Sequence, residues 1–120
     1  MEGFSQLAVW QRSVKLCEEV FRAAGSGRDF GFRDQITRAA LSVPSNIAEG
    51  YERGSRADYV RFLYMAKGSL GELRTQLHVG TRIGLLGEGG AGGLLDEAEQ
   101  ISRMLQTMIS RLKQDRQKPD

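Results

Sequence analysis

Apolar residues recur every three or four positions along four separate stretches of the chain, with polar residues between them. This spacing places the apolar side chains on one face of a helix. The four stripes are Leu7, Trp10, Val14, Cys17, Phe21 and Ala24; Ile36, Ala39, Ala40, Val43 and Ile47; Tyr59, Leu63, Ala66, Leu70, Leu73 and Leu77; and Leu94, Ala98, Ile101, Leu105, Met108 and Leu112. No convincing alternating stretch is present, so we predict no strands. Four such helices joined by short loops predict an all-α, antiparallel, up-down four-helix bundle.

Capping and turn residues divide the chain into these helices, and residues 1–120 are expected to form a single domain. Ser5 is a candidate cap of the first helix, which should end at residues 25–27. The second helix is expected over about 33–50. Ser55 is placed to cap the third helix, which should end near Gly84. Residues 84–93 hold six of the fifteen glycines and predict a flexible linker before the fourth helix.

Pro44 lies inside the second predicted helix. Proline has no backbone N–H and clashes with the carbonyl four residues earlier, at a cost of about 3 kcal/mol in a helix interior. We therefore expect a kink or a new helix start near Val43, and a helix end at Gly50 or Gly54.

A second, polar stripe runs beside the apolar one in this segment. It consists of Ser42, Asn46, Glu49 and Arg53, at spacings of four, three and four residues. Two interpretations are open: hydrogen-bonded polar groups that fix the register between helices, or a direct role in ligand binding or catalysis. The structural interpretation is favoured.

The second and third predicted helices should form a hairpin with its turn near Arg53. That register brings Gln35 level with Glu72 and Ala39 level with Ser69, and it lets Arg38 reach Glu72. Contacts among these polar groups would lock the helix register. Gly68 and Gly71 would allow close approach of two backbones, or make a subunit interface on that face plausible.

The polar segment also carries a family resemblance. The string Ser42-x-Pro44-Ser45-Asn46-Ile47-Ala48-Glu49-Gly50, followed by Arg53-Gly54-Ser55, resembles the signature of the four-helix-bundle proteins named for intervening sequences in 23S ribosomal RNA genes. Further similar strings are Phe4-x-x-Leu7-x-Val9-Trp10-Gln11, residues 35–40, and Tyr59-x-Arg61-Phe62-Leu63 with Gly68-Ser69-Leu70-x-Glu72-Leu73. The resemblance covers about residues 4–112.

The resemblance has implications for assembly and partners. A similar fold serves as the accessory variability protein of diversity-generating retroelements. Both relatives imply a ring-shaped homopentamer, and the accessory protein implies binding to RNA or DNA and to a reverse transcriptase.

Composition narrows the classes of function. The net charge is only +2, so the basic residues do not by themselves indicate a strong positive field. Cys17 is the one cysteine, which excludes an internal disulfide. Its place on an apolar helix stripe indicates a buried, reduced thiol. No apolar run could span a bilayer and no signal peptide is readable, so we expect a cytoplasmic protein without membrane contact.

The chemistry needed for catalysis is poorly represented. His78 is the only histidine, and neither a di-iron set nor a zinc set can be assembled around it. Gly87, Gly89 and Gly92 satisfy G-x-G-x-x-G, but a helix rather than a strand precedes them, which argues against a dinucleotide site. We expect no enzyme activity, no metal and no cofactor.

Basic residues gather toward the end of the fourth helix. The candidate nucleic-acid-binding residues are Arg103, Arg111, Lys113, Arg116 and Lys118. The apolar stripe ends at Leu112 and Pro119 opposes further helix, so the tail of about 113–120 is expected to fray. Two hypotheses follow: an oligomer that binds nucleic acid, or a nucleic-acid enzyme, through basic surfaces repeated around a ring, and a protein-interaction scaffold that binds no nucleic acid.

Overall fold

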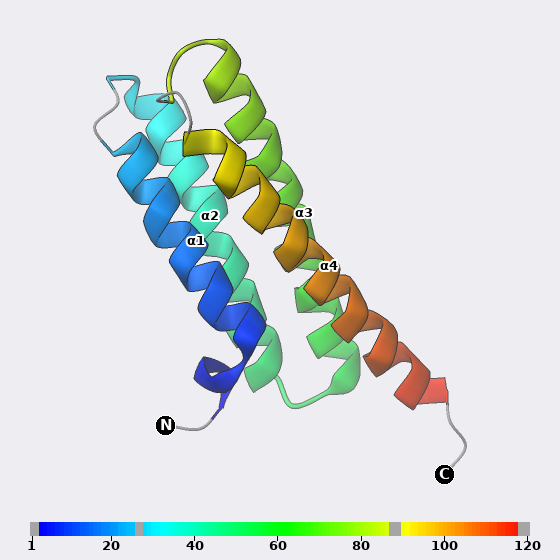
Figure 1. The fold of residues 1–120 in the computed structure, drawn as a ribbon. Helices are drawn as coiled ribbons and strands as arrows, with labels where there is room; N and C mark the ends of the chain where they lie inside the picture. Colours follow the sequence, from blue (N-terminus) through cyan, green and yellow to red (C-terminus); the bar gives the residue numbers. More distant parts are fainter. Residues whose placement is uncertain (1–2, 26–27, 87–89, 118–120) are drawn as a thin grey trace.

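Four helices and one short 3-10 turn make up the protein in a computed structural model that describes residues 3–25, 28–86 and 90–117. The elements are η1 (Phe4–Gln6), α1 (Ala8–Ala24), α2 (Phe30–Glu52), α3 (Arg56–Arg82) and α4 (Gly90–Gln117). No strand occurs in these residues. The helices run alternately up and down in an elongated bundle of 55 × 26 × 21 Å (Figure 1), which confirms the predicted all-α class.

Short polar side chains cap the start of two helices, Ser55 as predicted and Asp29 at a helix start three residues earlier than expected. The Ser55 hydroxyl accepts the Asp58 N–H at 3.1 Å at the start of α3, and the Asp29 carboxylate accepts the Phe32 N–H at 2.8 Å at the start of α2. The expected cap at Ser5 is wrong, because Ser5 lies in η1 and Leu7 occupies the cap position without a side-chain hydrogen bond.

A glycine with a positive φ lies in the turn after α2 and another in the turn after α3. Gly54 has φ +84° and Gly84 has φ +76°, a backbone region that favours glycine. The helix end predicted at Gly50 or Gly54 therefore falls just before Gly54. The predicted linker 84–93 is shorter than expected, because α4 already begins at Gly90.

Helix α2 continues through Pro44, so the new helix start that we considered near Val43 does not occur. The other alternative, a kink, stays a prediction. Polar side chains on both sides of the proline donate to carbonyl groups of the helical turn that precedes it. The Ser42 hydroxyl donates to the Ala39 carbonyl at 2.8 Å, and the Ser45 hydroxyl donates to the Leu41 carbonyl at 2.9 Å. The Asn46 amide donates to the Ser42 carbonyl at 2.9 Å. These polar residues thus make hydrogen bonds within their own helix, and none of these bonds reaches a neighbouring helix.

The apolar stripes of α2, α3 and α4 form the core largely as predicted, but the stripe of α1 is displaced. The buried face of α1 consists of Val9, Ser13, Leu16, Cys17, Val20 and Ala24. Trp10 and Val14 are half-buried, and Phe21 is 46% exposed. Ser13 interrupts the true apolar stripe and so concealed it. Its hydroxyl donates to the Val9 carbonyl at 2.7 Å, which allows it to be buried.

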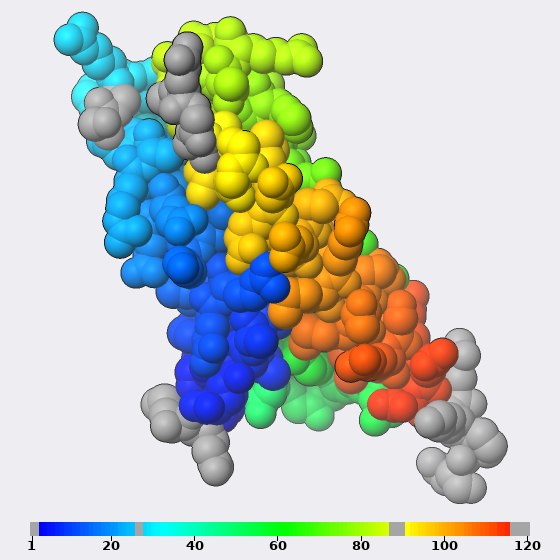
Figure 2. Space-filling model, viewed as in Figure 1, coloured from blue at the N-terminus to red at the C-terminus, as the bar shows by residue number. Residues whose placement is uncertain are grey.

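The two ends of the bundle differ in how closely α4 approaches α1 (Figure 1). In the upper part, which we call the closed half (residues 12–25, 28–40, 68–86 and 90–103), α4 lies against α1 and α3. In the lower part, the open half (residues 3–11, 41–67 and 104–117), α4 leans away from α1. In Figure 2, atoms of the α2–α3 turn are visible between the start of α1 and the end of α4.

Candidate nucleic-acid interface

The candidate basic residues of α4 divide between two surfaces. Arg103 and Arg111 are exposed and line one shallow hollow of about 410 Å³, together with Gln106, Thr107, Ser110 and Gln114. Arg103 forms an ion pair with Glu99 at 3.3 Å, and Glu99 also binds Arg74 at 2.6 Å. Arg111 makes no ion pair within the described residues, so its charge is available.

Lys113 lies on the other surface and joins α4 to α3. Its Nζ donates to the Tyr64 hydroxyl at 2.9 Å and lies 5.1 Å from the centre of the Tyr64 ring. Helix α4 continues to Gln117. The fraying expected over about 113–120 stays a prediction, and residues 118–120 lie outside the described part of the chain. Arg116 lies within α4, and Lys118 falls outside the described residues.

The turn between α2 and α3 adds further basic groups beside aromatic rings. The guanidinium carbons of Arg53 and Arg61 lie 5.0 and 4.7 Å from the centre of the Phe62 ring. Both arginines also pair with carboxylates of their own helices at 3.5 Å, Arg53 with Glu49 and Arg61 with Asp58. Arg56 is exposed and makes no ion pair in the described part of the chain.

Two tyrosines complete this end of the bundle. Tyr51 and Tyr59 meet edge to face, with ring centres 6.0 Å apart. They line a hollow of about 240 Å³ to which Leu112 of α4 also contributes. We call the group the basic–aromatic cluster; it consists of Tyr51, Arg53, Arg56, Tyr59, Arg61, Phe62, Tyr64 and Lys113. Candidates from the α2–α3 turn and from the end of α4 therefore share one end of the molecule.

Gly50 explains how α2 and α3 come close enough to form this cluster. A Cβ atom at residue 50 would lie 2.7 Å from the Phe62 Cβ and 3.2 Å from Tyr59 Cδ1. The sequence predicted close approach at Gly68 and Gly71 instead. That prediction is wrong within this chain, because both glycines are exposed and a Cβ on either would meet nothing within 4 Å.

The polar contacts expected between α2 and α3 do not form. Gln35, Arg38 and Glu72 are all exposed, and no hydrogen bond or ion pair joins them among the described residues. Ser69 is half-buried and has no hydrogen-bond partner there. The three exposed side chains project outward from their helices, so the register is set by apolar packing and by Gly50.

Ion pairs do lock the bundle, but at positions that the sequence analysis missed. Arg12 of α1 holds Glu97 of α4 through two hydrogen bonds of 2.6 and 2.9 Å and also reaches Gln100 at 2.8 Å. This contact lowers the pKa of Glu97 and raises that of Arg12. Opposite charges facing each other on α1 and α4 were the available signal. Their register could not be read without knowing which face of α1 is buried.

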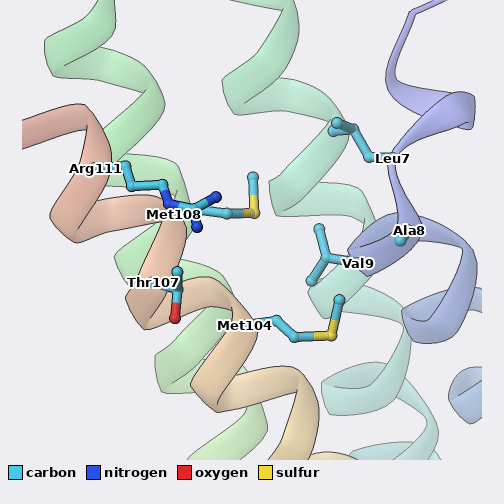
Figure 3. A pocket seen from close by; sticks show the side chains of 7 residues that line it. All are labelled: Leu7, Ala8, Val9, Met104, Thr107, Met108 and Arg111. Carbon is cyan, nitrogen blue, oxygen red and sulfur yellow. The ribbon is translucent and has the colours of Figure 1, made fainter. Parts of the chain in front are cut away.

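An apolar groove lies between α1 and the diverging part of α4 (Figure 3). Its volume is about 350 Å³, and its lining is Leu7, Ala8, Val9, Met104, Thr107, Met108 and Arg111. In the close-up, the two methionine side chains extend from α4 toward the start of α1. Methionine adapts to varied apolar surfaces, which suits this groove to a protein contact.

The described residues hold no group of three or more His, Cys, Asp or Glu side chains that could bind a metal ion. His78 is exposed on α3, one position past Leu77 of the apolar stripe. Cys17 is buried, and burial raises the pKa of its thiol, so the predicted inert thiol fits its surroundings. Among these same residues no helix is long and apolar enough to cross a membrane.

Comparison with known proteins agrees with this architecture. The family model described as 23S rRNA-intervening sequence protein matches residues 5–107. The chain belongs to this family. The resemblance inferred from the Ser42–Gly50 signature is thereby confirmed, and the basic–aromatic cluster lies on the four-helix fold of this family member.

A solved structure supports the fold of this 23S rRNA-intervening sequence protein. It is the crystal structure of a protein with unknown function from the S23 ribosomal protein family of Bacteroides thetaiotaomicron, with a TM-score of 0.79 and 21% identity. The alignment covers 85% of this chain and 98% of that chain. No curated protein matches the chain.

Proposed function

We propose that this 23S rRNA-intervening sequence protein is a non-enzymatic, oligomeric nucleic-acid-binding protein whose binding surface is the open half of the bundle. The observation that carries the proposal is the basic–aromatic cluster. Positive side chains on two neighbouring segments lie beside aromatic rings there, of which Tyr51 and Tyr64 are exposed. Exposed rings among positive charges are the combination used to stack bases and track a phosphate backbone. Arg111 of the open half adds a charge, unpaired within the described residues, on a second surface of α4, where Arg103 lies at the edge of the closed half and is paired with Glu99.

The charges in the cluster favour weak, sequence-independent binding. Arg53 and Arg61 form ion pairs with carboxylates of this chain, whereas Arg56 and Arg111 make no ion pair among the residues described. Contacts to phosphates carry no direct sequence information. Repetition of the surface in an oligomer would raise the overall affinity, because several weak contacts engage one strand at once.

The oligomeric part of the proposal rests on exposed apolar side chains. Phe21, Leu41, Met65, Val79 and Ile83 are each between 45% and 60% exposed, and together they leave apolar area on several faces of a small bundle. The family resemblance points to a homopentameric ring. Light scattering after size-exclusion chromatography should give about five times the 13.3 kDa chain mass, and a monomer at micromolar concentration would contradict this part.

Fluorescence anisotropy with labelled oligonucleotides tests the nucleic-acid part. We expect weak binding that is insensitive to sequence and falls steeply between about 50 and 200 mM salt. Replacing Arg111, Lys113, Arg116 and Lys118 by glutamine should abolish binding and leave the helical signal and the oligomer mass unchanged.

A matched control removes the same amount of charge from the closed half. Replacing Lys15, Arg22, Arg28 and Arg82, all exposed, by glutamine should leave binding unchanged. If the first variant retains affinity, the α2–α3 turn with Arg53, Arg56 and Arg61 is the main contact. If both variants lose affinity equally, only the total charge matters and the proposed surface is wrong.

The apolar groove favours a second candidate, a protein-interaction scaffold that binds no nucleic acid. Its partner would place an apolar segment against Met104 and Met108, and a nucleic-acid enzyme such as a reverse transcriptase is one partner that the resemblance suggests. Binding that persists at high salt and is lost in Met104→Glu would support this candidate, whereas steep salt dependence supports the first.

A further inference from the structure

The hollow beneath the α2–α3 turn has features that the proposed function does not need. Its lining is Gly50, Tyr51, Gly54, Ser55, Arg56, Tyr59 and Leu112. At about 240 Å³ it is smaller than the roughly 300 Å³ at which pockets for drug-sized ligands begin, which suits a ligand of one or two rings.

Part of the lining of this hollow is backbone. Gly50 contributes no side chain, because a Cβ there would collide with Phe62. Gly54 holds the turn at φ +84°, and a Cβ at that residue would meet nothing within 4 Å. A flat group can therefore approach the chain closely at the turn.

The walls of the hollow are aromatic. Tyr51 is 41% exposed, so part of its ring is free for stacking. Tyr59 is half-buried and fixed by its edge-to-face contact with Tyr51. Neither hydroxyl has a hydrogen-bond partner among the described residues. Burial and the neighbouring Tyr51 raise the pKa of Tyr59, which keeps its hydroxyl protonated and able to donate.

One cation at the hollow is available for an anion. Of the three arginines around the turn, Arg53 is paired with Glu49 and Arg61 with Asp58. Arg56 makes no ion pair in the part of the chain that the structure describes, and it lines the hollow directly. A ligand that fits has a planar ring system with polar edges and a negative charge beside it.

We propose that this hollow binds one unpaired nucleobase of a nucleic-acid strand, with the base stacked on Tyr51, its polar edge at the Tyr59 hydroxyl and its phosphate at Arg56. The proposal rests on the proposed function and specifies its substrate class. A base in a duplex has both faces covered by stacking and cannot enter the hollow. The protein should therefore prefer single strands, or unpaired bases in loops and ends, to a continuous duplex.

The test compares a labelled single strand with the blunt duplex of the same sequence, using the full-length chain and fluorescence anisotropy. Wild type should bind the single strand more tightly. Tyr51→Leu should weaken single-strand binding by about tenfold, as expected for loss of one stacked base, without changing the salt dependence. Arg56→Gln should lower the slope of log K against log salt by about 0.7, the contribution of one phosphate contact.

Matched controls sit at the opposite end of the bundle. Phe30 is 63% exposed, so Phe30→Leu removes an aromatic ring from the surface without touching the hollow. Arg82→Gln similarly removes one exposed charge. Both variants should bind like wild type, and circular dichroism should show unchanged helix content in all four.

A strand carrying 2-aminopurine gives an independent readout of stacking. Its fluorescence should be quenched on binding to wild type and to Phe30→Leu, but not on binding to Tyr51→Leu. Equal affinity for strand and duplex, with no effect of Tyr51→Leu, would overturn the base-binding hollow and leave the proposed function standing. Failure of wild type to bind either form even at low salt would overturn both.

Discussion

The closed and open halves of this bundle are built from the same four helices, but they differ in how closely α4 packs against α1 and in what their surfaces carry. In the closed half, Arg12 and Arg74 tie α4 to α1 and α3 through ion pairs of 2.6 Å, and Leu86 packs beside Gly80. In the open half α4 diverges from α1, and a groove lined by methionine remains. The difference indicates that ion pairs hold α4 against both neighbouring helices in the closed half, while the open half carries the groove and the basic–aromatic cluster.

Truncation should separate the core of the closed half from the groove of the open half most strongly. Leu77 of the closed half is fully buried, so Leu77→Ala should lower the free energy of unfolding by about 2–5 kcal/mol. Met108 of the open half is only half-buried at the groove, and Met108→Ala should cost about 1 kcal/mol or less. Urea unfolding measures both. An equally large loss for Met108→Ala would show that another surface covers the groove.

Two glycines, Gly50 in the open half and Gly68 in the closed half, differ in the space around them and give a second test of the comparison between the halves. Gly50→Ala in the open half should cost about 1–3 kcal/mol, because its Cβ would meet the Phe62 Cβ at 2.7 Å. Gly68→Ala should stabilise the protein by up to about 1 kcal/mol, because the site is an exposed helix interior with open space around it. Thermal unfolding of the two variants gives the signs, and destabilisation by Gly68→Ala would place that face in an interface.

The ion pairs provide a smaller test. A double-mutant cycle on Arg12 and Glu97 should give a coupling free energy of about 1 kcal/mol, whereas the more exposed pair Arg61 and Asp58 in the open half should give a few tenths. Equal coupling free energies for the two pairs would show that ion pairs do not hold the closed half together more strongly than the open half.

The Arg12–Glu97 contact should also make stability depend on pH. Because Arg12 lowers the pKa of Glu97 in the folded state, the contribution is complete above the unfolded value of about 4.3. It should be lost as the pH falls further and Glu97 becomes protonated in the folded protein. The difference in unfolding free energy between wild type and Glu97→Gln should therefore shrink in acid, and a difference that grows in acid would contradict this assignment.

The sequence predicted the helices better than the contacts between them. The stripes of α2, α3 and α4 were clear because apolar residues occupy nearly every inward position. On α1 the inward stripe is broken by Ser13, so spacing favoured a continuous stripe of which only Cys17 and Ala24 are buried and Phe21 is exposed.

Contacts between helices depend on rotation about each helix axis, which spacing along one helix does not determine. The predicted pairs of Glu72 failed for this reason, and the pair of Arg12 with Glu97 was missed. The candidate site was predicted in part. Charge alone made Arg111 and Lys113 candidates. Only the fold shows that Lys113 contacts Tyr64 and that Leu112 lies beside the two tyrosines of the turn.

Hydrogen–deuterium exchange with and without a single-stranded oligonucleotide tests the central claim, that the open half is the binding surface, most directly. The oligonucleotide should slow exchange around residues 50–64 and 104–117 and leave residues 16–25, 28–36 and 76–86 unchanged. Protection confined to those closed-half segments, or bound oligonucleotide with no protection in the open half, would contradict the account.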